Sequence, residues 1–138
     1  MKKNNNYTVE KSTQQWKSEL DPLSYHVLRE QGTERPFSGV YNEHFEKGTY
    51  LCKGCHSPLY SSESKFASGC GWPSFDAALP GAIEYRKDKS HGMLRTEIVC
   101  SQCGSHQGHV FNDGPTDTGM RYCVNSVSIA FNDSEKSR

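Results

Sequence analysis

Six cysteines carry most of the chemistry that this sequence could perform. Two Cys-x-x-Cys pairs contain four of them: Cys52 with Cys55, and Cys100 with Cys103. The other two, Cys70 and Cys123, lie in local sequences unlike the pairs and unlike each other, and a structural role is hardest to find for Cys123. This distribution suggests four thiols that hold a metal ion and two that remain for reaction chemistry.

The two Cys-x-x-Cys pairs suit a closed tetrahedral zinc site, because structural zinc is commonly bound by four thiolates. One pair alone would leave open a redox motif of the thioredoxin type, whereas two pairs favour zinc. Forty-four residues separate the pairs, more than a compact zinc ribbon allows. We therefore expect one structural zinc ion per chain, joining two parts of a larger sheet domain. Gly54 and Gly104 are expected to supply left-handed backbone in the two turns.

The segment around Cys123 has the composition of a strand, and 120–131 is predicted as one continuous element. Because alternate side chains of a strand share a face, Arg121, Cys123 and Asn125 should project together. Val127, Ile129 and Phe131 should continue that face. A guanidinium beside a thiol favours the nucleophilic thiolate. The alternative is a buried cysteine that acts as a small hydrophobic residue, and this face alone does not decide between them.

Two histidines follow the second cysteine pair. His106 and His109, with Asp113, lie in a segment bounded by glycines that we interpret as a loop. Imidazoles can donate protons near neutral pH, so this loop could supply an acid for catalysis. The alternatives are exposed turn histidines or a His-x-x-His metal site, although the expected zinc already has four better ligands.

The remaining elements are short. Trp16 and Leu20 suit one side of a short helix, and Asp21 with Pro22 predicts the start of a second helix that Gly32 ends. Short apolar runs interrupted by glycine, proline and serine then predict antiparallel strands. These runs are 49–51, 58–60, 83–85 and 93–99.

The size and charge of the chain exclude several classes. The length fits one domain, which we place at 12–132, with flexible tails at 1–11 and 133–138. Sixteen basic residues balance sixteen acidic ones, which argues against a nucleic-acid partner. No apolar run has the length of a membrane span, and the amino terminus does not read as a secretory signal. We expect a cytoplasmic protein in a reducing compartment, where paired cysteines bind metal or do redox work.

Several motifs together resemble methionine-R-sulfoxide reductase, the type B enzyme. The resemblance extends from about Asp21 to Phe131. The motifs that carry it are 68–75 (SGCGWPSF), 108–111 (GHVF), 121–126 (RYCVNS), 32–37 (GTERPF) and 90–93 (SHGM). The chain departs from the family pattern at Gln107, where leucine is usual, and at Asn112, where aspartate is common.

The resemblance implies a set of roles. Cys123 would attack the sulfur of the R epimer of methionine sulfoxide, in proteins or as the free amino acid, and become a sulfenic acid. His109, with His106 beside it, would donate a proton to the sulfoxide oxygen. Arg121 and Asn125 would orient groups around the thiolate. The substrate pocket would be formed by Trp72, which packs against the S-methyl group, and by Phe111.

The resemblance also implies how the enzyme is recycled. Cys70 matches the resolving cysteine, which would form a disulfide with Cys123 for reduction by thioredoxin. The implied fold is mainly β, with two small antiparallel sheets, peripheral helices near the amino terminus, and the zinc far from the active site. We expect a monomer. Two other classes compete with this hypothesis: a zinc-ribbon-like interaction module without turnover, which assigns no role to Cys70, Cys123 or Trp72, and a different thiol enzyme using Cys123.

Overall fold

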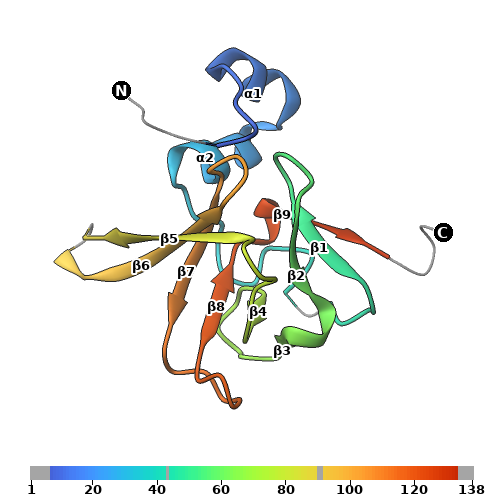
Figure 1. The fold of residues 1–138 in the computed structure, drawn as a ribbon, viewed down its shortest axis with the longest axis vertical. Helices are drawn as coiled ribbons and strands as arrows, with labels where there is room; N and C mark the ends of the chain where they lie inside the picture. The colour runs from blue at the N-terminus through green and yellow to red at the C-terminus, as the bar shows by residue number, and fades with distance from the viewer. Residues whose placement is uncertain (1–6, 43, 90–91, 134–138) are drawn as a thin grey trace.

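The protein is mainly β. The computed structural model describes residues 7–42, 44–89 and 92–133, and this part of the chain contains two helices followed by two antiparallel sheets (Figure 1). The expected fold class is thus confirmed. Ser90 and His91 of the motif at 90–93 lie outside the described residues.

Two short helices lie at one end of the molecule (Figure 1). Their bounds are Thr13–Glu19 for α1 and Pro22–Glu30 for α2. Ser12 and Gln15 form a capping box at the start of α1, and the Asp21 side chain accepts from Ser24 N at 3.2 Å to cap α2, as predicted. The residue that ends α2 is Gln31 and not Gly32, because Gln31 takes the left-handed conformation (φ 60°).

The nine strands of the described chain form one small and one larger sheet. The three-stranded sheet has the order β2–β1–β9 and the six-stranded sheet the order β3–β4–β8–β7–β6–β5. The smaller sheet consists of β1 (Thr49–Cys52), β2 (Pro58–Ser61) and β9 (Ile129–Asn132). The larger sheet consists of β3 (Lys65–Phe66), β4 (Ser74–Phe75), β5 (Ile83–Asp88), β6 (Arg95–Cys100), β7 (His106–Phe111) and β8 (Arg121–Val124).

Aromatic side chains from both sheets form the centre of the core. Tyr60 of β2 stacks on Phe75 of β4 with ring centroids 4.4 Å apart, and Tyr50 of β1 meets Phe75 edge-on at 5.2 Å. All three are fully buried. Val27 and Leu28 of α2 belong to the same buried cluster. The rings therefore join the smaller sheet to the larger one through apolar contact.

The segment 120–131 is not one strand, contrary to the sequence prediction. β8 ends at Val124, a 3-10 helix (η3, Ser126–Ser128) follows, and β9 then joins the smaller sheet by pairing with β1. The Glu34 carboxylate causes this break, because it accepts from Ser126 N at 2.9 Å and from Val127 N at 3.1 Å. These amides cannot then continue the ladder of β8. Ile129 therefore does not extend the face that carries Cys123.

The histidine segment is a strand rather than a loop. His106 and His109 belong to β7, which pairs with β6 on one side and with β8 on the other. An apolar–polar alternation is weak in this segment because glycine and glutamine interrupt it. The strand forms because both of its edges find partners.

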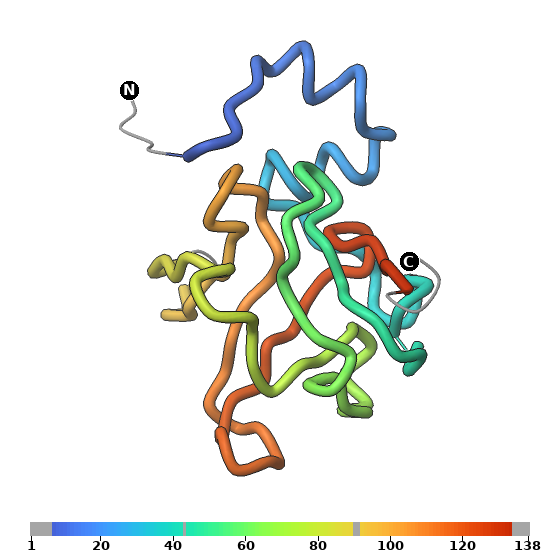
Figure 2. Tube along the Cα trace, turned by 45° about the vertical axis from the view of Figure 1, so that its right-hand side comes forward, coloured from blue at the N-terminus to red at the C-terminus, as the bar shows by residue number. Residues whose placement is uncertain are grey.

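The amino-terminal segment from Tyr7 runs beside the turn between β6 and β7 (Figure 2). Val9 N donates to Gln102 O at 2.9 Å, and the Tyr7 hydroxyl donates to Glu84 at 2.5 Å. Residues 1–6 and 134–138 of the two expected tails lie outside the described residues, so the domain limits 12–132 stay a prediction. Within the described chain, neither helix is long and apolar enough to cross a membrane.

Replacing Glu34 with glutamine tests the break after β8. The amide would keep one acceptor but place an N–H group against a backbone N–H, so the free energy of unfolding should fall by about 1–3 kcal/mol. Chemical denaturation measures this change. The exposed Glu63→Gln is the matched control and should stay within about 0.5 kcal/mol of the unmodified protein. Equal stabilities of the two variants would contradict the role of Glu34.

Candidate functional site

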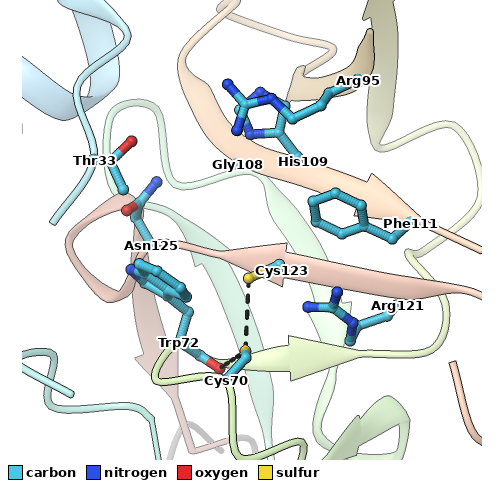
Figure 3. A pocket seen from close by; sticks show the side chains of 10 residues that line it. All are labelled: Thr33, Cys70, Trp72, Arg95, Gly108, His109, Phe111, Arg121, Cys123 and Asn125. Atoms are coloured by element: carbon cyan, nitrogen blue, oxygen red, sulfur yellow. Dashed lines mark hydrogen bonds between the residues drawn. The ribbon is translucent and has the colours of Figure 1, made fainter. Parts of the chain in front are cut away.

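A cavity of about 280 Å³ opens beside β7 and β8 (Figure 3). Seven of the residues predicted for the catalytic and substrate sites line it, and His106 does not. Three further lining residues, Thr33, Arg95 and Gly108, were not predicted. The seven are Cys70, Trp72, His109, Phe111, Arg121, Cys123 and Asn125.

The two unpaired cysteines meet at this cavity. Cys70 lies in the loop before β4 and Cys123 in β8, and their sulfur atoms are 3.7 Å apart as free thiols (Figure 3). The ladder between β4 and β8 sets this distance, because Ser74 is the direct partner of Cys123. A small movement of the loop would bring the sulfurs to the bonding distance of about 2.05 Å.

The contact between the two thiols shifts their pKa values in opposite directions. The pKa of Cys70 is lowered to about 4, first by the hydrogen bond from the Cys123 thiol and then by those from Ser68 and Ser74. The pKa of Cys123 is raised, first because its proton is held by Cys70 and second because it is buried. Arg121 acts in the opposite direction and lowers the pKa of Cys123, as the sequence suggested. The contact between the two thiols therefore favours the thiolate on Cys70 over the thiolate on Cys123.

Arg121 is held in place by two partners. Its Nε and Nη2 donate to the two carboxylate oxygens of Asp113 at 2.9 and 3.1 Å. Its guanidinium also lies over the Phe111 ring, 4.6 Å from the centroid. A bidentate pair and a ring contact together orient the positive charge toward the thiols.

Close approach of β7 and β8 brings His109 to Cys123. The two residues are direct partners across the ladder. A Cβ on Gly108 would lie 2.0 Å from Cys123 O, so only glycine permits this approach. His109 and Cys123 therefore face the same cavity from neighbouring strands.

His109 has a carboxylate partner that sequence reasoning missed. Its Nε2 lies 2.7 Å from Asp88 Oδ2, and Arg95 Nη2 donates to the same oxygen at 3.2 Å. Asp88 and Arg95 are the last and first residues of β5 and β6 and are direct partners in that hairpin. The available sequence signal was an acidic residue, Asp88, and a basic residue, Arg95, at the ends of neighbouring strand segments. Only the strand register places their side chains next to His109.

His106 lies beside His109, as expected, but it is not among the residues that line the cavity. Its Nδ1 lies 2.7 Å from Glu97 Oε2, and both side chains are only 4% exposed. Glu97 also accepts from Gln31 Nε2 at 2.9 Å. The His106 ring stands edge-on to His109 at 5.6 Å between centroids. It contacts the ring that lines the cavity but does not itself reach the cavity.

Asn125 and Trp72 are fixed by the backbone of the loop after α2. Asn125 Oδ1 accepts from Glu34 N at 3.0 Å, and its Nδ2 donates to Gln107 O at 3.1 Å. The Trp72 ring nitrogen donates to Glu34 O at 3.1 Å. Glu34, through its backbone and its carboxylate, thus holds the Trp72 wall, Asn125 and η3 in one arrangement.

The four remaining cysteines form a cluster whose positions suit a metal ion. Their sulfur atoms all lie within 4.8 Å of one another, with Cys52 and Cys103 3.7 Å apart and Cys55 and Cys100 3.6 Å apart. Four sulfurs around a tetrahedral zinc, with bonds of about 2.3 Å, stand about 3.8 Å apart. The donor set therefore fits a metal ion of this kind. One pair lies at the β1–β2 turn and the other at the β6–β7 turn, so the cluster joins the two sheets.

Of the two turn glycines, Gly104 behaves as expected and Gly54 does not. Gly104 is left-handed (φ 78°), but in the first turn His56 takes that conformation (φ 68°) and Gly54 does not. Gly54 is instead required by space, since a Cβ there would lie 2.9 Å from Ser105 Oγ and 3.1 Å from the Trp16 ring.

Comparison with known proteins supports the family resemblance found in the sequence. The SelR domain matches residues 20–133. The chain belongs to the SelR domain family. Proteins named peptide methionine sulfoxide reductase MsrB are similar over most of their length. That of Leptospira interrogans is 54% identical over 91% of this chain and 97% of its own. That of Pseudomonas savastanoi is 56% identical over 88% and 93%, and that of Methanosarcina mazei 55% identical over 92% and 91%.

Within this SelR domain, Gln107 connects the cysteine cluster to the core. Its side chain is fully buried and its Nε2 donates to Ser128 O at 3.4 Å and lies 3.9 Å from Cys52 Sγ. The Tyr60 hydroxyl donates to its Oε1 at 3.5 Å. Gln107, which stands where leucine is usual in the family, therefore has hydrogen-bond partners for the polar atoms of its side chain.

The cluster should stabilise the SelR domain when it holds metal. Cys52→Ser should remove the bound metal and lower the midpoint of thermal unfolding by roughly 10 °C or more, because binding energy at such a site is folding energy. Elemental analysis and thermal unfolding measure the two quantities. Cys70→Ser removes a thiol outside the cluster and should retain the metal. Unchanged thermal stability after loss of metal would contradict this prediction.

Proposed function

We propose that this protein reduces the R epimer of methionine sulfoxide, in proteins and as the free amino acid, with Cys123 as nucleophile and Cys70 as resolving thiol. The observation that carries the proposal is the 3.7 Å contact between these two sulfurs in a cavity that Trp72 and His109 also line. The similarity to proteins named peptide methionine sulfoxide reductase supports the substrate class.

The first step transfers the sulfoxide oxygen to the enzyme. As substrate enters, the Cys123 proton passes to Cys70, and the Cys123 thiolate attacks the sulfoxide sulfur while His109 donates a proton to its oxygen. The hydroxyl then passes to the Cys123 sulfur while the sulfoxide sulfur–oxygen bond and the new sulfur–sulfur bond break, so that methionine leaves and Cys123 becomes a sulfenic acid. Methionine sulfoxide is reduced by two electrons and Cys123 is oxidised by two.

The second step restores the thiols. Cys70 gives up the proton that it took from Cys123, and its sulfur attacks the sulfenic acid sulfur. A Cys70–Cys123 disulfide forms, the sulfur–oxygen bond of the sulfenic acid breaks, and the oxygen leaves as water with that proton. A dithiol protein of the thioredoxin class then reduces this disulfide by exchange and becomes oxidised itself. The hydrogen bonds from Ser68 and Ser74 lower the pKa of Cys70 and support the assignment, because they help this thiol to lose its proton when it attacks.

The other cavity residues support binding and orientation. The flat face of Trp72, fixed by its bond to Glu34 O, offers an apolar wall for the S-methyl group. Phe111 lines the cavity on the other side of Cys123 (Figure 3). Arg121 favours negative charge on Cys123, and Asn125 lines the cavity beside Trp72. His106 assists only through its contact with His109.

We further propose that the cysteine cluster holds one zinc ion with a structural role. Four thiolates satisfy zinc completely, and none of these four cysteines is among the described residues that line the cavity. Zinc bound there neutralises charge among four neighbouring thiolates and links the two hairpin turns.

The other proposals follow from the cysteine chemistry. Free reactive thiols favour a reducing compartment, which we propose to be the cytoplasm. We also propose that the protein is a monomer, and that its partners are thioredoxin and oxidised proteins. The competing function from the sequence, an interaction module without turnover, is disfavoured by the similarity to proteins named peptide methionine sulfoxide reductase MsrB. The gathering of Cys70, Cys123 and Trp72 in one cavity speaks for chemistry instead.

Epimer selectivity tests the proposed function. If Trp72 seats the methyl group, only the R epimer directs its oxygen to His109. Turnover of the separated epimers with dithiothreitol should therefore be confined to the R form. Equal rates on both epimers, or no turnover of either, would contradict the proposal.

Two serine variants separate the roles of the reactive cysteines. Cys123→Ser should abolish all reduction, because a neutral hydroxyl cannot replace a thiolate. Cys70→Ser should release about one methionine per enzyme in a single turnover and then stop as a sulfenic acid that dimedone traps. Methionine quantification and mass spectrometry measure these outcomes.

The reductant distinguishes the two variants further. Cys70→Ser should lose most thioredoxin-driven turnover but keep part of the dithiothreitol-driven rate, since a small dithiol reduces the sulfenic acid directly. Full thioredoxin-driven turnover by Cys70→Ser would show that Cys70 is not the resolving residue.

A further inference from the structure

A hydrogen-bonded group of three side chains forms part of the cavity wall. Asp88 Oδ2 lies 2.7 Å from His109 Nε2 and accepts from Arg95 Nη2 at 3.2 Å. The side chains of His109, Asp88 and Arg95 are 13%, 14% and 24% exposed. One carboxylate oxygen thus serves both an imidazole and a guanidinium, away from most of the solvent.

The strand pairing fixes this geometry. Asp88 and Arg95 are partners in the β5–β6 hairpin, and β7, which carries His109, pairs with β6 on its other edge. The Asp88 carboxylate therefore reaches across β6 to the imidazole. Described charged and titratable groups from neighbouring elements surround His109: Asp88 of β5, Arg95 and Glu97 of β6, His106 of β7, Arg121 and Cys123 of β8, and Cys70 of the loop before β4.

These groups act on His109 in opposite directions. Burial lowers the pKa of His109 below its ordinary value of 6.5, and the positive charge of Arg95 lowers it further. The hydrogen bond to Asp88 and the charge of that carboxylate raise it. Glu97 is already bonded to His106, so Asp88 is the carboxylate that bonds the His109 ring.

An acid that donates a proton must hold one when substrate arrives. Burial in the cavity wall disfavours the imidazolium, and the nearby guanidinium does the same. The Asp88 carboxylate at hydrogen-bond distance stabilises the imidazolium and also fixes the plane of the ring. The cavity therefore needs Asp88 if His109 is to work as an acid near neutral pH.

We propose that Asp88 is a positioning residue that keeps the His109 ring in its protonated form through its contact with Nε2, and that Arg95 opposes it by sharing the same carboxylate oxygen. The proposal rests on the proposed function, because it concerns the acid of that reaction. Asp88 acts through His109 and does not touch the substrate. The balance between Asp88 and Arg95 sets the pH range in which the sulfoxide reduction step is fast.

Two charge-neutralising variants give opposite expectations. Asp88→Asn keeps the shape of the side chain but removes its charge, and Arg95→Gln keeps a donor toward Asp88 but removes the positive charge. The protonated fraction of an acid falls as pH rises through its pKa. Asp88→Asn should therefore move this fall to lower pH, and Arg95→Gln should move it to higher pH.

Nuclear magnetic resonance titration of the His109 ring protons measures the effect without any reaction. The resonance is assigned by its absence in His109→Gln. The same variants are tested in single-turnover reduction of the R sulfoxide as a function of pH. At a pH above the pKa of His109, Asp88→Asn should be slower by about tenfold for each unit by which that pKa falls. Asp88→Glu, which restores a carboxylate, should recover part of the rate.

Glu30→Gln provides a matched control. Glu30 pairs with His26 at 3.1 Å on the exposed side of α2, so this variant removes a carboxylate from another histidine. It should leave the His109 titration and the turnover profile unchanged. Unfolding midpoints of all variants are compared, and Arg95→Gln gives the test of sign even if Asp88→Asn folds poorly.

The outcomes separate this proposal from the proposed function. Opposite shifts in Asp88→Asn and Arg95→Gln, in the titration and in the profile, support the proposal. Shifts in the same direction, or an unchanged titration in both, overturn it while sulfoxide turnover by the unmodified protein continues. Absence of that turnover in the unmodified protein would count against the proposed function instead.

Discussion

Strand β8 pairs on both sides at Cys123, and the arrangement of the cavity depends on this double pairing. Cys123 is the ladder partner of Ser74 in β4 and of His109 in β7. The first pairing brings the loop with Cys70 to 3.7 Å between sulfurs, and the second brings the imidazole. Backbone hydrogen bonds, which tolerate little displacement, thus set the spacing of all three groups. Gly108 permits it by leaving room for Cys123 O.

The cysteine cluster and Glu34 keep the other segments in register with β8. The cluster joins the β1–β2 turn to the β6–β7 turn. It therefore attaches the smaller sheet next to the start of β7, the strand that carries both histidines. Glu34 connects the loop after α2 to η3 and gives Trp72 its hydrogen-bond acceptor. Both connections join residues far apart in the sequence, and both act on elements that line the cavity rather than on the reacting sulfurs.

Electrostatic balance is a shared property of the cavity groups. The hydrogen bond between Cys70 and Cys123 favours the thiolate on Cys70. The positive charge of Arg121 interacts with Asp113 and also with the two thiols. Asp88 and Arg95 similarly oppose each other at His109. In each case a group that stabilises a charge faces one that limits it.

The sequence by itself determined the chemistry-bearing residues, the cap of α2 and the mainly β class, because cysteine spacing, Asp-Pro and short apolar runs are local signals. It also predicted that Arg121, Cys123 and Asn125 project together, and all three line the cavity. Only the tertiary structure decided that β8 ends after Val124, that the histidine segment is a strand, that His106 is buried on Glu97, and that Asp88 reaches His109. These depend on partners supplied by other strands and by Glu34, 92 residues from Ser126. Local sequence does not encode which distant carbonyl or carboxylate accepts a hydrogen bond from a given N–H group. Strand register and long-range hydrogen bonds therefore decided these four features.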